Sequence, residues 1–207
     1  MIRISGGAAK GRRIRVERAF TKKNGGDELR PTSSKVREAL FDIMRNEVPG
    51  ASFLDLYAGT GGVGIEALSR GAAQVVFVES NRIRADVIRQ IVGRLHFAER
   101  SKVIEGKALD FVLREGKVKE HRYDIVYLDP PYHSGELTKM LPLLGEGRIL
   151  QEGGVVVVEH FSKTSMPEGV KWLTLRKRYK YGDTSLTVYT LKKGGPDELK
   201  DDLGNNA

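Results

Sequence analysis

Residues 53–67 read Phe53-Leu-Asp-Leu-Tyr-Ala-Gly-Thr-Gly-Gly-Val-Gly-Ile-Glu-Ala67. The stretch begins as an apolar, strand-like run and continues with helical spacing, and Gly59, Gly61 and Gly64 lie at the junction. Glycines let the backbone turn tightly and approach a ligand, which then faces the N–H groups of the first helical turn. The order of strand, glycine loop and helix therefore predicts a nucleotide-binding βα unit.

The chain on both sides of this stretch alternates between strand-like and helical periodicity. A helix is predicted from Ser33 or Ser34, after Pro31. The predicted strands are 53–57, 75–79, 103–105, 123–128 and 155–159, and the predicted helices between them include 63–69, 82–96 and 137–144. Repeated βα units predict an α/β, Rossmann-like fold with a doubly wound, mostly parallel sheet. Residues 171–179 and 185–191, joined by Gly182-Asp183, predict an antiparallel hairpin at one edge of that sheet.

The ends of the chain differ from this pattern. Glycine pairs and short apolar pairs predict at most a small hairpin near the N-terminus, and the last residues are acidic and rich in turn formers. We therefore expect a basic extension over residues 1–31, one domain over residues 32–193, and a disordered tail over residues 194–207.

The composition excludes several classes of protein. The chain of 207 residues has no cysteine, so disulfides, thiolate metal sites and thiol nucleophiles are excluded. The four histidines are scattered without ligand spacing, so no metal site is predicted. No apolar run is long enough to span a membrane, and no secretory signal is recognised at Met1. We expect a cytoplasmic monomer.

The formal net charge of +8 is concentrated in two segments. Residues 1–40 contain eleven basic and four acidic side chains, and residues 171–181 contain five basic side chains, no acid and three aromatic rings. Basic and aromatic residues together are typical of nucleic-acid binding, although a solvated basic face is the alternative for either segment. The predicted RNA-binding residues are Lys10, Arg12, Arg13, Arg15, Arg30, Arg176, Lys177 and Arg178.

Two carboxylates narrow the choice of nucleotide. Glu79 ends the strand after the glycine loop, where it can accept hydrogen bonds from a ribose diol. Asp55 lies at the start of the loop and would repel a dinucleotide pyrophosphate. S-adenosylmethionine carries no phosphate and has two cationic groups, so Asp55 favours it over a nicotinamide cofactor. A turn hydrogen bond made by Asp55 is the structural alternative.

Residues 123–132 read Tyr-Asp-Ile-Val-Tyr-Leu-Asp-Pro-Pro-Tyr and end a predicted buried strand with two prolines. Proline supplies no N–H group, so the Asp129 carboxylate and the Pro130 carbonyl would be acceptors at the strand's carboxyl end. An exocyclic amine placed there could donate both hydrogens and direct its lone pair at a sulfonium methyl. Tyr132 would stack on the base that carries the amine. A turn that only ends the strand is the structural alternative.

These motifs resemble those of known methyltransferases. Asp55, Gly59, Gly61 and Glu79, together with Asp129-Pro-Pro-Tyr132, resemble the class I S-adenosylmethionine-dependent enzymes that modify exocyclic amines. More narrowly, the RsmD family is similar in four segments: Ile2-Arg-Ile-Ser-Gly-Gly7 with Lys10-Gly-Arg12, Leu29-Arg-Pro-Thr-Ser-Ser-Lys-Val-Arg-Glu-Ala-Leu-Phe41, Gly64-Ile-Glu-Ala-Leu-Ser-Arg-Gly-Ala72 and Asp129–Tyr132. This resemblance implies methylation of a guanine N2 in 16S rRNA, with the assembled small ribosomal subunit as substrate.

The resemblance also implies roles for single residues. Thr32 would lie near the methionine end of the cofactor, and Asp129 and Tyr132 would lie at the target base. Many methyltransferases have Asp before the residue equivalent to Ala108, where this chain has Lys107. Ala108, Leu109 and Asp110 are therefore the candidates for the adenine contact.

Two other functions remain open from the sequence. An adenine-N6 methyltransferase acting on RNA or DNA would use the same Asp129 chemistry. A non-catalytic RNA-binding protein of ribosome assembly would explain the basic segments, but it would leave residues 129–132 without a role.

Overall fold

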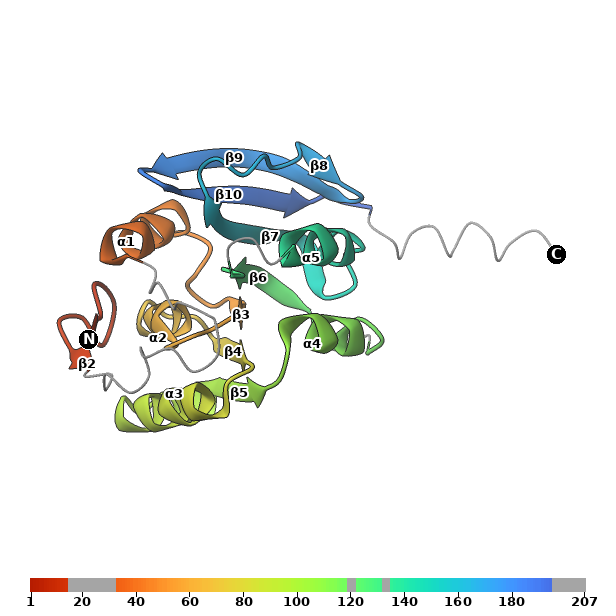
Figure 1. Ribbon diagram of the computed structural model, residues 1–207. Helices are drawn as coiled ribbons and strands as arrows, with labels where there is room; N and C mark the ends of the chain where they lie inside the picture. Colours follow the sequence, from red (N-terminus) through yellow and green to blue (C-terminus); the bar gives the residue numbers. More distant parts are fainter. Residues whose placement is uncertain (15–32, 119–121, 132–134, 195–207) are drawn as a thin grey trace. The chain divides into compact units, whose positions relative to one another are not determined.

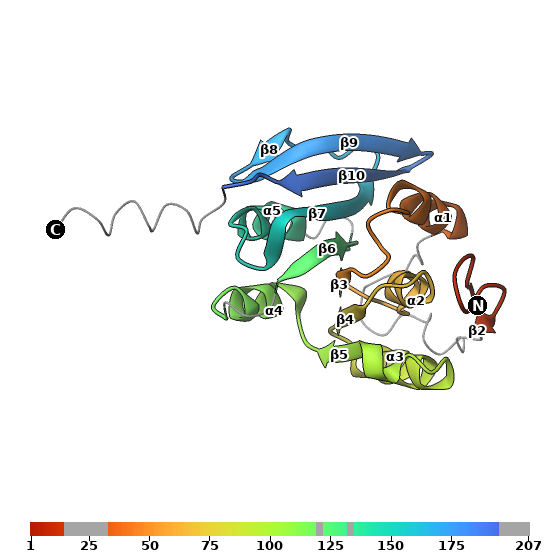
Figure 2. The ribbon, with the colours of Figure 1, turned by 180° about the vertical axis from the view of Figure 1, so that it is seen from behind.

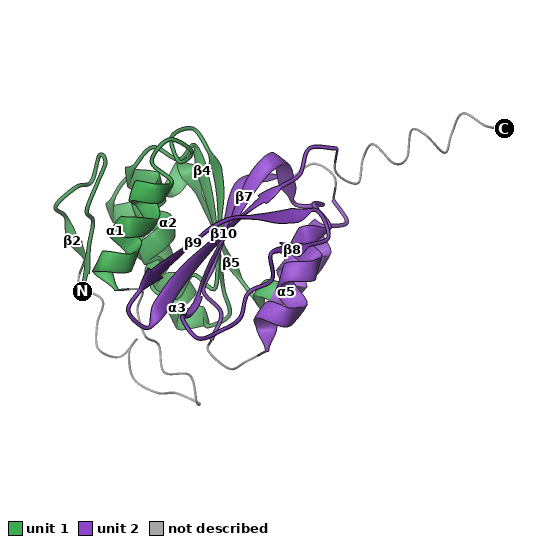
Figure 3. Ribbon diagram, turned by 90° about the horizontal axis from the view of Figure 1, so that it is seen from above, with its two compact units in different colours: residues 1–108 green, residues 109–207 purple. Residues whose placement is uncertain are grey.

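The computed structural model describes residues 1–14, 33–118, 122–131 and 135–194. The chain divides into two compact units, residues 1–108 and residues 109–207, which Figure 3 shows in separate colours. Large aromatic side chains are fully buried in both units, among them Phe53 and Phe77 in the first and Tyr127 and Tyr189 in the second.

The first unit is built on three parallel strands. β3 (Ser52–Leu56) pairs with β4 (Gln74–Glu79), and β4 pairs with β5 (Ser101–Glu105). α2 (Gly62–Ser69) connects β3 to β4, and α3 (Arg82–Arg94) with the short helix η2 (Ala98–Arg100) connects β4 to β5 (Figure 1). The predicted alternation of strand and helix is therefore found in this unit.

α1 (Ser34–Ile43) precedes β3 and begins where the capping signal predicts. The Ser33 side chain accepts a hydrogen bond from the N–H of Val36 at 3.2 Å. At the N-terminus, β1 (Ile2–Arg3) pairs antiparallel with β2 (Arg13–Ile14). Residues 15–32 and 195–207 lie outside the described residues, so the division into extension, domain and tail remains our proposal.

Glu66 on α2 anchors the N-terminal segment. Its side chain is fully buried, and it accepts hydrogen bonds from the backbone N–H of Ser5 (2.9 Å) and Gly6 (2.8 Å). Arg70 Nε donates to the same carboxylate at 2.9 Å, and Arg37 Nε lies 3.8 Å from it. A buried carboxylate without partners would be costly, so these contacts hold residues 5–6 against α2.

The second unit combines parallel and antiparallel pairing. α4 (Ala108–Glu115), which begins at the unit boundary, precedes β6 (Tyr123–Leu128), and α5 (Glu136–Gly145) connects β6 to the parallel strand β7 (Leu150–Phe161). β7 pairs antiparallel with β10 (Thr184–Leu191). β10 pairs antiparallel with β9 (Leu173–Tyr181), and β9 with β8 (Gly169–Val170) (Figure 2). The predicted C-terminal hairpin is confirmed, with Gly182 at φ 63° in its turn.

β7 is much longer than the predicted strand 155–159. Its pairing with β6 is irregular between Tyr123 and Ile125, and Gly153 has φ 72° inside the strand. The predicted strand begins at Val155, whereas β7 begins at Leu150 and continues through Gly153-Gly154 as a bulge. No helix in the described part of the chain has the length and apolar character needed to cross a membrane.

Gly64→Ala should destabilise the protein, because the added Cβ would overlap Cε1 of Phe77 on β4. Overpacking of this kind costs roughly 1–3 kcal/mol. Gly93→Ala in α3 is the matched control, because no neighbour is found within 4 Å of its Cβ position. This control should be neutral, or stabilise the protein by up to about 1 kcal/mol. Urea unfolding measures both effects, and equal stability of the two variants would contradict the tight contact of α2 with β4.

Candidate functional site

The loop between β3 and α2 passes through three residues with positive φ. The values are 64° for Tyr57, 57° for Gly59 and 77° for Gly61, which is the N-cap residue of α2. Glycine adopts this conformation at little cost, whereas a tyrosine is strained in it. The loop is thus held in a defined shape at the carboxyl end of β3, the end of a strand at which α/β sheets bind ligands.

Asp55 lies beneath this loop and is 1% exposed. Its Oδ2 accepts a hydrogen bond of 2.9 Å from the N–H of Gly64 in the first turn of α2. Burial raises the pKa of the Asp55 carboxyl from 3.8 to about 7, the Gly64 N–H opposes this rise, and the nearby Glu79 charge adds to it. The predicted structural alternative, a hydrogen bond within the turn, is therefore present.

Glu79 ties the loop to the next helix. Its Oε2 accepts from the N–H of Gly59 at 2.8 Å, and its Oε1 accepts from the N–H of Asn81 at 2.7 Å. Asn81 is the N-cap of α3, since its side chain accepts from the N–H of Arg84 at 3.2 Å. Each carboxylate oxygen has two acceptor positions, so Glu79 keeps acceptor capacity beside the loop.

Sequence reasoning missed the hydrogen bonds by which Glu79 connects the loop to α3, although Asn81 directly before a helical pattern is a recognisable capping signal. The structure thus brings together five predicted cofactor residues in the first unit: Asp55, Gly59, Gly61, Gly64 and Glu79.

The other predicted cofactor residues are placed less completely. Ala108 is buried at the start of α4, Leu109 is half-buried, and Lys107 is exposed. Thr32 lies outside the described residues, so its role remains a prediction.

The end of β6 has the predicted form. Asp129 follows the last residue of the strand and is half-buried, Pro130 is buried, and Pro131 is exposed. These residues follow the carboxyl end of a strand that is parallel to β7. Tyr132 lies outside the described residues.

The basic residues predicted to bind RNA are at the surface wherever the structure describes them. Lys10, Arg12 and Arg13 are exposed in the first unit. Arg176, Lys177 and Arg178 are exposed on β9 in the second unit, although Arg178 also donates to the Met166 carbonyl oxygen at 2.7 Å. Arg15 and Arg30 lie outside the described residues.

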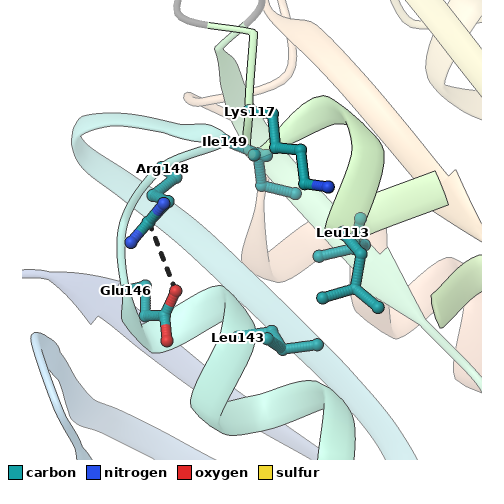
Figure 4. A pocket seen from close by; sticks show the side chains of 8 residues that line it. Leu113, Lys117, Leu143, Glu146, Arg148 and Ile149 are labelled. Atoms are coloured by element: carbon teal, nitrogen blue, oxygen red, sulfur yellow. Dashed lines mark ion pairs between the residues drawn. The ribbon is translucent and has the colours of Figure 1, made fainter. Parts of the chain in front are cut away.

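A small cavity of about 140 Å³ lies in the second unit (Figure 4). It is lined by residues at the ends of α4 and α5 and before β7, and Glu146 and Arg148 form an ion pair of 3.3 Å beside it. Its lining includes none of the predicted site residues. In the described ranges, no group of three or more His, Asp or Glu side chains could hold a metal ion.

Comparison with known proteins identifies the family. The family model described as "Conserved hypothetical protein 95" matches residues 2–190, and the chain belongs to this family. It is 32% identical to "Putative rRNA methyltransferase YlbH" of Bacillus subtilis, over 94% of this chain and all of that protein. It is 31% identical to "Ribosomal RNA small subunit methyltransferase D" of Haemophilus influenzae, over 91% of this chain and 93% of that protein. The predicted resemblance is thus confirmed in part: the chain belongs to the family described as "Conserved hypothetical protein 95" and is similar to these two relatives.

Solved structures confirm the predicted fold. "Putative methyltransferase yhhF" from Escherichia coli is 29% identical, with a TM-score of 0.76 over 92% of this chain and 98% of that one. An RNA methyltransferase from Salinibacter ruber, solved in complex with S-adenosyl-L-homocysteine, shares the fold with a TM-score of 0.59 at 18% identity, over 82% of this chain and 98% of that one. The chain has an α/β, class I methyltransferase-like fold with a mostly parallel mixed sheet and antiparallel C-terminal strands.

Replacing Asp55 should change how stability depends on pH. The pKa of this acid is about 7 in the folded chain and near 3.8 when unfolded. Between these two pH values Asp55 is protonated in the folded state and ionised in the unfolded state. The free energy of unfolding therefore falls as pH rises from about 4 to about 7. Asp55→Asn can still accept from Gly64 and does not titrate, so its stability relative to wild type should increase by a few kcal/mol over that range. Urea unfolding at a series of pH values tests this, and a constant difference between the two proteins would contradict the burial of a titrating Asp55.

Proposed function

We propose that this chain, as a member of that family, transfers a methyl group from S-adenosylmethionine to the exocyclic N2 of a guanine in 16S rRNA of the small ribosomal subunit. The observation that carries the proposal is the pair of buried carboxylates, Asp55 and Glu79, at the glycine loop after β3. The names of two relatives, "Putative rRNA methyltransferase YlbH" and "Ribosomal RNA small subunit methyltransferase D", support the proposed class of substrate.

The residues at this loop fit the methyl donor. Glu79 can accept from ribose hydroxyls with its remaining lone pairs, and a cation beside Asp55 would favour the charged form of that acid. A pyrophosphate would instead meet two buried acids, which is unfavourable. Gly59 and Gly61 would let the backbone approach the cofactor, and Thr32, Ala108 and Leu109 complete the proposed contacts.

The residues after β6 would hold the methyl acceptor. S-adenosylmethionine, when bound, supplies an electrophilic methyl group. The Asp129 carboxylate and the Pro130 carbonyl would accept the two hydrogens of the amine, so that its lone pair is directed at that methyl. Positioning of this kind can lower a barrier by roughly 7–11 kcal/mol, and no strong base is required. Tyr132 would stack on the target base.

The exposed basic residues would hold the phosphates of the rRNA. Lys10, Arg12 and Arg13 are exposed on the N-terminal segment, which Glu66 holds against α2 through residues 5–6. On β9, Lys177 Nζ lies 5.1 Å from the ring centre of Tyr179, so positive charge and an aromatic face occur together there. Such contacts would make the affinity fall as salt rises.

The cofactor assignment predicts that the protein binds S-adenosylmethionine and not NAD. Glu79→Ala should weaken binding by roughly 1–3 kcal/mol, because the ribose hydroxyls lose a charged acceptor. Glu105→Ala is the matched control: Glu105 lies opposite Glu79 at the end of β5, and it is exposed. Titration calorimetry with both ligands is the measurement. Equal affinity for NAD, or equal effects of the two substitutions, would contradict the proposed cofactor site.

The proposed reaction is tested on small subunits isolated from a strain that lacks the protein. With labelled methyl donor, the wild-type protein should methylate one guanine at N2, which mass spectrometry of rRNA fragments identifies. Asp129→Ala should bind cofactor and subunits nearly normally but lose at least about 10²-fold in kcat, as expected when one preorganised polar contact to a transition state is removed. Asp129→Asn should keep part of the rate, because its amide oxygen still accepts.

Asp124→Ala serves as the control for this series, because Asp124 lies at the opposite end of β6. It should keep the wild-type rate of methyl transfer. A wild-type rate for Asp129→Ala would contradict the catalytic role of Asp129. Labelled methyl on an adenine N6 would show that adenine, and not guanine, is the methyl acceptor.

A further inference from the structure

A buried tyrosine–glutamate pair in the second unit takes no part in the chemistry derived above. The Tyr127 hydroxyl on β6 donates a hydrogen bond of 2.6 Å to Oε2 of Glu159 on β7. The two residues are 2% and 4% exposed. Glu159 is therefore a carboxylate kept in the interior next to the segment that we propose holds the methyl acceptor.

The strand register places Glu159 beside Asp129. The last paired residues of β6 and β7 are Leu128 and Val158, and the residues that follow them in the chain are Asp129, directly after β6, and Glu159, within β7. Alternation along β6 gives Tyr127 and Asp129 the same face of the sheet, and the bond to Tyr127 shows that Glu159 shares this face. Adjacent strands lie about 4.8 Å apart, so a base held at Asp129 would lie within reach of Glu159.

The neighbouring residue on β7 has a different role. His160 Nε2 lies 2.7 Å from Oγ1 of Thr187 on β10, so its side chain is bound across the β7–β10 pair. Glu159 is therefore the ionisable residue of this part of β7 that shares a face with Asp129.

A carboxylate at this position distinguishes guanine from adenine. The Watson–Crick edge of guanine presents the N1–H donor next to the N2 amine, whereas N1 of adenine carries a lone pair. Flipped bases are recognised by hydrogen bonds to this edge. A carboxylate would accept from the guanine N1–H and would repel the adenine lone pair.

We propose that Glu159 is the specificity-determining residue for the target base: it accepts a hydrogen bond from the guanine N1–H while Asp129 and Pro130 accept from the N2 amine. Tyr127 is a positioning residue that orients the Glu159 carboxylate through its hydroxyl. This inference rests on the proposed guanine-N2 methyl transfer and names how that site selects its base.

The test uses a base analogue that keeps the reacting amine. Once the methylated position is mapped, small subunits are reconstituted with 16S rRNA in which its guanine is replaced by 2,6-diaminopurine, which retains the 2-amino group but has a lone pair at N1 in place of N1–H. The wild-type protein should methylate this RNA roughly 10- to 100-fold more slowly than the guanine RNA, the range expected for loss of one good base contact. Glu159→Gln should reduce this ratio to within a few-fold, because its amide can donate to N1.

Three further variants separate recognition from a purely structural role. Tyr127→Phe should lower the guanine preference in part, because Glu159 is no longer oriented. Tyr189→Phe removes a comparable hydroxyl bond, to the Pro167 carbonyl oxygen at 2.8 Å, and Glu152→Gln changes an exposed acid on β7. Both controls should keep the wild-type ratio, and thermal unfolding of each variant reports its stability separately.

The outcomes distinguish this inference from the function on which it rests. Equal wild-type rates on the two RNAs would overturn the role of Glu159 without any variant, as would a full guanine preference in a folded Glu159→Gln protein. Failure of the wild-type protein to methylate the guanine RNA would instead overturn the proposed function, and this inference with it.

Discussion

The cost of burying a carboxylate governs the candidate cofactor site. Asp55 and Glu79 lie almost entirely inside the first unit, so their oxygens require hydrogen-bond donors. The donors are the backbone N–H groups of Gly64, Gly59 and Asn81, which belong to the glycine loop and to the starts of α2 and α3. The loop can keep its strained Tyr57 conformation because these bonds join it to both neighbouring helices.

The same principle attaches the N-terminal segment. Glu66 is fully buried on α2 and receives backbone N–H groups from residues 5–6 and the guanidinium of Arg70. Removing any partner would leave a buried charge less well compensated, so the segment has a single favourable place on the helix. The exposed basic side chains of Lys10, Arg12 and Arg13 follow a few residues after the backbone that Glu66 holds.

In the second unit, hydrogen-bond acceptors lie at the carboxyl ends of β6 and β7, where strand pairing restricts their movement. β7 is paired on both sides, in parallel with β6 and antiparallel with β10, so the residues at its end have little freedom. The proline after Asp129 prevents the strand from continuing, and the Tyr127–Glu159 bond holds a second carboxylate one strand away. Acceptors held on strand ends are more precisely oriented than acceptors on a loop, as methyl transfer to an amine would require.

Sequence periodicity and the glycine and proline motifs were enough to predict the alternating βα order, the start of α1 at Ser33 or Ser34, the loop after β3 and the C-terminal hairpin, because each depends on local conformational preference. The predicted strand 155–159 was too short, because pairing with β6 carries β7 through a bulge that periodicity does not show. The partners of Asp55, Glu79 and Glu66, and the pairing of Tyr127 with Glu159, were decided by tertiary structure alone. A sequence shows that an acid is present, but whether it is buried, and which donor lies within 3 Å of it, depends on how segments far apart in the chain pack together.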